Sequence, residues 1–253
     1  MQLIDSHCHL DDARFDQDRD IILTRAVNHG VDSYIVPAIS RSRWPKLQNL
    51  AAIHHTIYPA YGLHPWFFLQ HNDDDLDLLP LFLEQAVAVG ECGLDGGRAK
   101  SGKQQDEQLY WFRAQLDLAL AMHLPVIIHA YKAVDEVCRE LRLRPALTGV
   151  IHGFAGSAQQ AEAVITQGFY LGIGSSITYP QNKRLQSIVS EMPLERLLIE
   201  SDAPDQPPYT RRGQRNEPAF LLEIVQQLAT LRAADTASIA DQCNRNAREL
   251  FRL

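Results

Sequence analysis

Long apolar segments are missing from this 253-residue sequence. No run approaches the roughly 18 consecutive apolar residues that a membrane-spanning helix needs. The N-terminus also lacks the basic segment and apolar stretch that together mark a secretory signal peptide. We therefore expect a cytoplasmic protein that does not enter a membrane.

The sequence also has few cysteines and no excess of positive charge. The four cysteines are scattered and form no C-x-x-C pair, which disfavours a disulfide framework and a structural zinc knuckle. The 24 lysines and arginines are outnumbered by 31 aspartates and glutamates, giving a formal net charge of −7. Coating of DNA is not expected at this charge, because nonspecific binding depends on cations that displace the counterions of the phosphates. Nothing in the sequence indicates an obligate protein partner, and we expect a monomer.

What is present indicates an α/β fold. Short apolar runs alternate with segments of helical period, as in Leu109, Phe112, Leu116 and Leu120. Such continuous runs are typical of parallel strands covered by helices on both faces. The length suits a (β/α)8 TIM barrel of the metallo-dependent hydrolase type, as a single domain over residues 1–253. The predicted strands are residues 3–6, 33–37, 57–61, 86–91, 126–129, 149–151, 170–172 and 197–200. The predicted helices are residues 17–29, 44–54, 76–85, 104–123, 133–141, 157–167, 181–190, one starting near 216–218, and 235–250.

Two histidines, His7 and His9, end the first predicted strand. Side chains i and i+2 of a strand project to the same face, so both imidazoles can point at one metal ion, although a hydrogen-bonded pair is the alternative. Further apolar runs also end in metal-capable side chains. Because the carboxyl ends of barrel strands form the rim that carries active sites, we expect these side chains to meet there. The six candidate ligands are His7, His9, Glu91, His129, His152 and Asp202.

Short motifs around these residues resemble the TatD family of metal-dependent hydrolases and deoxyribonucleases. The motifs are D-S-H-C-H at 5–9, G-E-C-G-L-D at 90–95, P-V-I-I-H at 125–129, G-V-I-H-G-F at 149–154, L-G-I-G at 171–174 and E-S-D-A-P at 200–204. The resemblance extends to R-N-E-P at 215–218. It implies a TIM barrel with a two-metal site. One ion would be held by His7, His9, Glu91 and Asp202, and the other by Glu91, His129 and His152.

The residue types agree with that chemistry. Two divalent ions about 3.5–4 Å apart need a bridging anion, and Glu91 is the best candidate. Mixed imidazole and carboxylate ligands suit Zn²⁺, Mn²⁺, Fe²⁺ or Co²⁺ better than Mg²⁺. We expect two divalent cations per chain, and the sequence does not distinguish which of these metals they are. Asp202 is predicted to act in catalysis with Glu91, by accepting or relaying a proton. Asp5 and Asp95 can accept hydrogen bonds from ligand histidines, or serve only as loop caps.

Three further residues are predicted to contact substrate, with ordinary surface or loop roles as the alternative. His64 lies in the segment G-L-H-P, which relatives place near the substrate. Lys132 follows the fifth predicted strand, where many relatives have an arginine nearby, and Arg215 lies in a basic loop near the C-terminus. Trp66 replaces a histidine common in relatives, and could stack on a base or pack the loop. Gly96-Gly97-Arg98 stands where relatives commonly have an aromatic residue.

The favoured function is a divalent-metal-dependent phosphodiesterase or deoxyribonuclease, which uses a metal-activated water on DNA or another nucleotide-containing substrate. An amidohydrolase that cleaves a C–N or ester bond in a small molecule is the alternative, since a fold does not fix a function. Many such enzymes bridge their metals with a modified lysine at the fourth strand, where this chain has Glu91. A noncatalytic nucleic-acid-binding protein is disfavoured, because clustered imidazoles and carboxylates are costly to bury without a metal.

Overall fold

Eight parallel strands form one sheet whose spatial order is the order of the chain, in a computed structural model that describes residues 1–253. The first and last strands are joined beyond the ladder by the Ser6 backbone N–H, which donates to the Ile199 carbonyl at 3.0 Å. The sheet is therefore a nearly closed barrel. The strands are β1 (Leu3–Asp5), β2 (Val31–Ala38), β3 (Ile57–Tyr61), β4 (Ala88–Asp95), β5 (Val126–Tyr131), β6 (Gly149–Ile151), β7 (Tyr170–Ile173) and β8 (Leu197–Ile199).

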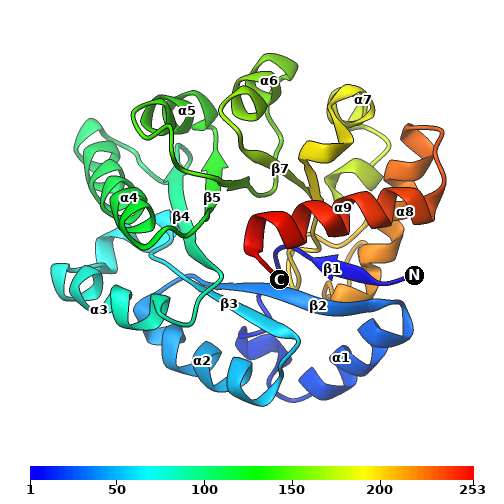
Figure 1. The fold of residues 1–253 in the computed structure, drawn as a ribbon, viewed down its shortest axis with the longest axis horizontal. Helices are drawn as coiled ribbons and strands as arrows, with labels where there is room; N and C mark the ends of the chain where they lie inside the picture. Colours follow the sequence, from blue (N-terminus) through cyan, green and yellow to red (C-terminus); the bar gives the residue numbers. More distant parts are fainter.

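Helices surround this barrel and complete the TIM-barrel fold predicted from the sequence (Figure 1). Most follow a strand and run back along its outer side, and no helix is both long and apolar enough to cross a bilayer. The helices are α1 (Arg19–Asn28), α2 (Trp44–Ile53), α3 (Asp73–Leu83), α4 (Gly102–Met122), α5 (Val134–Arg142), α6 (Ala158–Thr166), α7 (Lys183–Glu191), α8 (Leu221–Leu231) and α9 (Thr236–Phe251).

The inside of the barrel is filled by one inward-facing residue from each strand, among them Ile127 of β5 and Val150 of β6. Leu250 and Phe251 of α9 belong to the same cluster, so α9 closes the amino-terminal end of the barrel. Figure 1 shows α9 lying across the barrel on this side. The opposite rim, at the carboxyl ends of the strands, stays free for a functional site.

Strand alternation lifts the functional side chains into that rim. His129 and His152 lie two positions after Ile127 and Val150, and residues two apart share a face of a strand. Their imidazoles therefore form the next layer above the apolar filling of the barrel.

Some element boundaries differ from the sequence predictions. β4 continues through Asp95, so Glu91 lies within the strand and not at its end, and its ladder with β5 is interrupted between Val89 and Cys92. Such an interruption redirects a side chain, and here it falls at Glu91. The helix expected near residues 216–218 starts later, because Pro218–Phe220 form a 3-10 turn before α8. Asn72 and Asp75 form a capping box that starts α3 three residues earlier than predicted.

Candidate metal centre

Glu91 lies at the centre of the rim, almost fully buried, and its two carboxylate oxygens face different groups of histidines. Oε2 lies 3.3 Å from His7 Nε2 and 3.6 Å from His9 Nε2. Asp202 completes this side, because its Oδ1 is 3.7 Å from His7 Nε2 and 3.6 Å from His9 Nε2. Three of the other five predicted ligands thus converge on the Oε2 side of Glu91.

The other oxygen of Glu91 faces the remaining two predicted ligands. His152 Nε2 lies 2.7 Å from Oε1, and His129 Nδ1 lies 3.3 Å from it. The structure therefore brings all six predicted residues together around one carboxylate. The donor atoms of His7, His9 and Asp202, and of His7, Glu91 and His152, each lie within 4.8 Å of one another, a spacing that fits a metal ion.

The far nitrogens of two histidines show which ring atoms are free to bind a metal. His9 Nδ1 lies 3.1 Å from the Pro37 carbonyl oxygen, and His129 Nε2 lies 3.0 Å from Asp95 Oδ2. An acceptor at the far nitrogen holds the proton there, so the nitrogen that faces Glu91 keeps its lone pair. The predicted role of Asp95 as the acceptor for a ligand histidine is consistent with this contact.

His64 is a sixth partner of this centre, and its ring has the opposite arrangement. The sequence predicts a substrate contact, but His64 Nε2 lies 2.9 Å from Glu91 Oε1. The backbone N–H of Trp66 donates to His64 Nδ1 at 3.0 Å, which leaves the proton of the neutral ring on Nε2. His64 therefore donates a hydrogen bond to Glu91 and orients it. Its distances alone would group it with the metal ligands.

Burial and charge set the protonation of this cluster in opposite directions. Burial would raise the pKa of Glu91, but the surrounding histidines, His64 and His152 first, hold it well below its usual range. Burial opposes charge on His152, yet Glu91 and Glu200 raise its pKa well above the ordinary value. Burial lowers the pKa of His7 and brings that of His64 to about 4. A proton on His152 thus supplies positive charge that a divalent cation would otherwise bring.

Glu200 is a buried residue of the site that the sequence analysis missed. It comes two positions after the inward-facing Leu198, so strand alternation could have indicated it. Its Oε1 lies 3.7 Å from His152 Nδ1 and accepts a hydrogen bond from Gly153 N–H at 2.5 Å. Gly172 makes room for it, because a Cβ there would lie 3.0 Å from Glu200 Cδ. Glu200 thus lies beside Nδ1 of His152, the ring nitrogen that faces away from Glu91.

Asp5 does not accept a hydrogen bond from an imidazole, contrary to one of its two predicted roles. Its Oδ1 accepts from the backbone N–H groups of His7 at 3.3 Å and Ser201 at 2.9 Å, and its Oδ2 lies 2.5 Å from Ser201 Oγ. Burial outweighs these hydrogen bonds and raises its pKa to about 7. Asp5 therefore fastens the end of β1 to the segment that carries Asp202.

Asp202 is held by its backbone and by a neighbour that the sequence analysis also missed. It has a positive φ of 55°, a conformation that aspartate tolerates better than most residues, and its N–H donates to the His7 carbonyl at 2.9 Å. Gln206 Nε2 donates to Asp202 Oδ2. Oδ1 is therefore the oxygen that faces the two histidines.

A cavity of about 740 Å³ opens beside the histidines, over the loops that follow β4 to β7. His129 and His152 line it together with Lys132, as expected for a residue predicted to contact substrate. Arg215 lies elsewhere, with Nη2 2.5 Å from Asp18 Oδ2 and its guanidinium stacked on Phe15. Because that charge is already paired within the protein, we leave Arg215 out of the proposed substrate contacts.

An α/β barrel whose strand ends bring histidines and carboxylates together around one buried glutamate has the architecture of a metal-dependent hydrolase. The chain belongs to the TatD related DNase family, whose family model matches residues 4–252.

Two relatives and one solved structure support the assignment. The metal-dependent hydrolase YjjV of Escherichia coli is 36% identical over 99% of this chain and 98% of its own length. A protein of Erwinia billingiae named 3'-5' ssDNA/RNA exonuclease TatD is 34% identical, over 99% of both chains. The crystal structure of E. coli YjjV, with 35% identity, superposes with a TM-score of 0.94 over 99% of this chain and 98% of the other.

Proposed function

We propose that this chain is a divalent-metal-dependent phosphodiesterase that cleaves nucleic acid, with two cations held on the two sides of Glu91. The proposal rests on the two oxygens of that carboxylate, which face different histidines: Oε2 faces His7 and His9, whereas Oε1 faces His129 and His152. A single carboxylate between two sets of nitrogen donors is suited to bridge two ions. The name of the Erwinia relative, which specifies single-stranded DNA and RNA, supports nucleic acid as the substrate class.

His7, His9, Asp202 and Glu91 would hold one ion, and Glu91, His129 and His152 the other. Divalent cations at this place supply Lewis-acid stabilisation of a phosphoryl group and increase the acidity of a water molecule. Asp95 and the Pro37 carbonyl keep ring protons away from the centre, and His64 fixes the orientation of Glu91.

Asp202 is the candidate proton acceptor. Its Oδ2 is occupied by Gln206, whereas Oδ1 faces the centre, and the carboxylate is about one eighth exposed. This partial exposure leaves it in contact with the rim, where a water molecule and a substrate would meet. A general base must lie within hydrogen-bond reach of the proton that it removes, and Asp202 is the carboxylate of the cluster with an oxygen directed to the centre at its open side.

A substrate panel tests the proposal. Purified protein loaded with Mn²⁺, Co²⁺ or Zn²⁺ is offered single-stranded DNA, bis(p-nitrophenyl) phosphate, and amide and lactone substrates. We expect cleavage of the two phosphodiesters and little turnover of the others. Turnover of an amide or lactone without any phosphodiester cleavage would support the small-molecule amidohydrolase instead and refute the proposed function.

A further inference from the structure

Positive charge is distributed unevenly around the rim. In the loops after β1 and β2, arginines are neutralised by aspartates, as in Arg14 with Asp12 and Arg41 with Asp75. The loop after β8 holds both kinds of arginine, because Arg211 pairs with Glu223 whereas Arg212 lies over the ring of Tyr209. Arg98 after β4, Lys132 after β5 and Arg184 near the start of α7 form no ion pair with a carboxylate. Lys132 and Arg184 line the cavity, so part of this free positive charge lies where the cavity opens beside the centre.

Two exposed aromatic rings accompany these cations. Trp66 is 49% exposed, and the Arg98 guanidinium lies 4.6 Å from the centre of its ring. Tyr131 is 52% exposed, and Lys132 Nζ lies 5.3 Å from the centre of its ring. Single exposed rings are common on protein surfaces, so the observation that indicates a binding surface is the pairing of these two rings with free cations beside a candidate active site.

Both rings are anchored to the same loop beside His129. The Trp66 indole N–H donates to Asp95 Oδ2 at 2.5 Å, the oxygen that His129 Nε2 also contacts. Tyr131 packs on Gly97, where a Cβ would approach its ring to 2.9 Å. The Gly96-Gly97-Arg98 segment thus makes room for one ring and supplies the cation for the other.

We propose that Trp66 and Tyr131 form a stacking platform for the bases of a single-stranded nucleic acid, with Arg98 and Lys132 contacting the phosphates beside them. This inference rests on the proposed function and adds the side of the rim on which the strand lies. Aromatic rings interleaved with cations bind single strands without much sequence preference, because every base has a face that can stack. A duplex would not offer unstacked bases to these rings, so the platform selects single strands.

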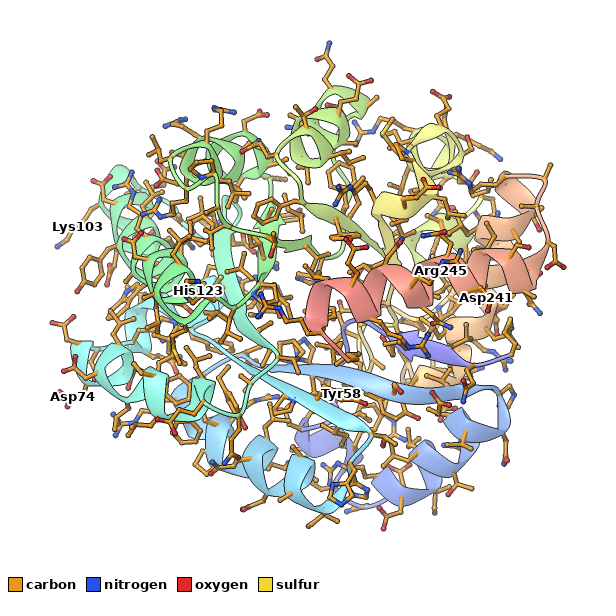
Figure 2. The ribbon with its side chains drawn as sticks, in the orientation of Figure 1. Tyr58, Asp74, Lys103, His123, Asp241 and Arg245 are labelled. Carbon is orange, nitrogen blue, oxygen red and sulfur yellow. The ribbon has the colours of Figure 1, made fainter.

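A labelled oligothymidylate is the probe, with binding measured by fluorescence anisotropy in the presence of chelator so that the strand is not cut. Trp66→Ala and Tyr131→Ala should each weaken binding by roughly 5- to 100-fold, the usual effect of losing one stacked ring. Tyr110→Ala is the matched control, because Tyr110 is also half exposed but binds Asp73 at the outer edge of α3. Figure 2 shows the neighbouring Asp74 at this outer edge. The control should bind as the wild type does.

Salt dependence tests the phosphate contacts. Arg98→Ala and Lys132→Ala should each reduce the slope of log affinity against log salt concentration by about 0.7, the value for one phosphate contact in a single strand. Arg245→Ala removes an exposed cation from α9, at the other end of the barrel, and should leave the slope unchanged (Figure 2). Lys103 points outward from the start of α4 in the same view, so Lys103→Ala should also leave the salt slope unchanged.

Trp66→Phe separates stacking from support of the centre. Phenylalanine keeps a ring but cannot donate to Asp95, so strand affinity should largely persist, and a fall in turnover would report the lost hydrogen bond. Normal strand binding by both alanine variants, or no strand binding by the wild type, would overturn the platform. A wild type that binds the strand through these rings but cleaves neither the strand nor bis(p-nitrophenyl) phosphate would refute the proposed function and leave the platform standing.

Discussion

Replacing Glu91 with glutamine should reduce metal affinity more than replacing any single histidine of the centre. Each histidine contacts a single oxygen of Glu91, whereas Glu91 offers one oxygen to each side of the cluster. Glutamine keeps the size of the side chain and can still accept the hydrogen bond from His64. The change therefore removes the negative charge with little change in packing.

The size of the effect follows from the surroundings of Glu91. The carboxylate is 1% exposed, and five imidazoles lie within 3.6 Å of it. Removing one partner from a buried charge pair costs about 3–5 kcal/mol, which corresponds to roughly 10²- to 10⁴-fold in affinity. Because the loss falls on both sides, we expect the variant to retain neither cation after desalting. His9→Ala should weaken binding on the Oε2 side alone.

Mass spectrometry would measure the metal content of each variant after desalting, and titration calorimetry would measure its affinity for Mn²⁺. Glu140→Gln is the matched control, since Glu140 of α5 is also 1% exposed but pairs with Arg113 of α4 at 2.7 Å. That control should lose stability and keep its metal. If Glu91→Gln retains wild-type metal content and near-normal turnover, Glu91 does not bridge two ions.

Three further results are expected. A chelator should abolish hydrolysis, and Mn²⁺, Co²⁺ or Zn²⁺ should restore it; chelator-resistant activity in metal-free protein would contradict the site. Asp202→Asn should keep its metal but lose turnover by about 10²- to 10⁴-fold, with an altered pH–rate profile, if Asp202 is the general base. Because burial raises the pKa of Asp5 to about 7, the folded protein keeps a proton that the unfolded chain releases above pH 4. Stability should therefore fall by up to about 4 kcal/mol between pH 4 and pH 7, a slope absent in urea unfolding of Asp5→Asn.

The sequence alone was sufficient for the barrel and for the convergence of the six candidate ligands. Apolar runs reveal strands, and alternation places residues such as His129 on the same face as Ile127, so only the order of the strands had to be assumed. The later end of β4 was not predictable in this way. Cys92 and Leu94 are apolar, but the glycines beside them weaken the strand pattern, and the interruption at Glu91 depends on pairing with β5.

Contacts between loops were beyond the sequence, because they join residues far apart in the chain. The partner of Arg215 is Asp18, almost 200 positions away, and nothing near either residue indicates the pair. Asp5 is suited by its position to accept a hydrogen bond from a histidine ring, but its carboxylate accepts one from Ser201, near the other end of the chain. In each case a local pattern indicated a chemical ability, and the fold supplied a different partner.

The choice of ligands within the centre depends on the same kind of distant contact. A neutral imidazole has one lone pair, and the group at its far nitrogen decides whether that lone pair or a proton faces the site. Asp95 directs the lone pair of His129 inward, whereas the Trp66 backbone N–H directs the proton of His64 inward. Both histidines lie about 3 Å from the same oxygen of Glu91. Distance to the centre therefore does not distinguish a metal ligand from a residue that positions one, but the partner of the far nitrogen does.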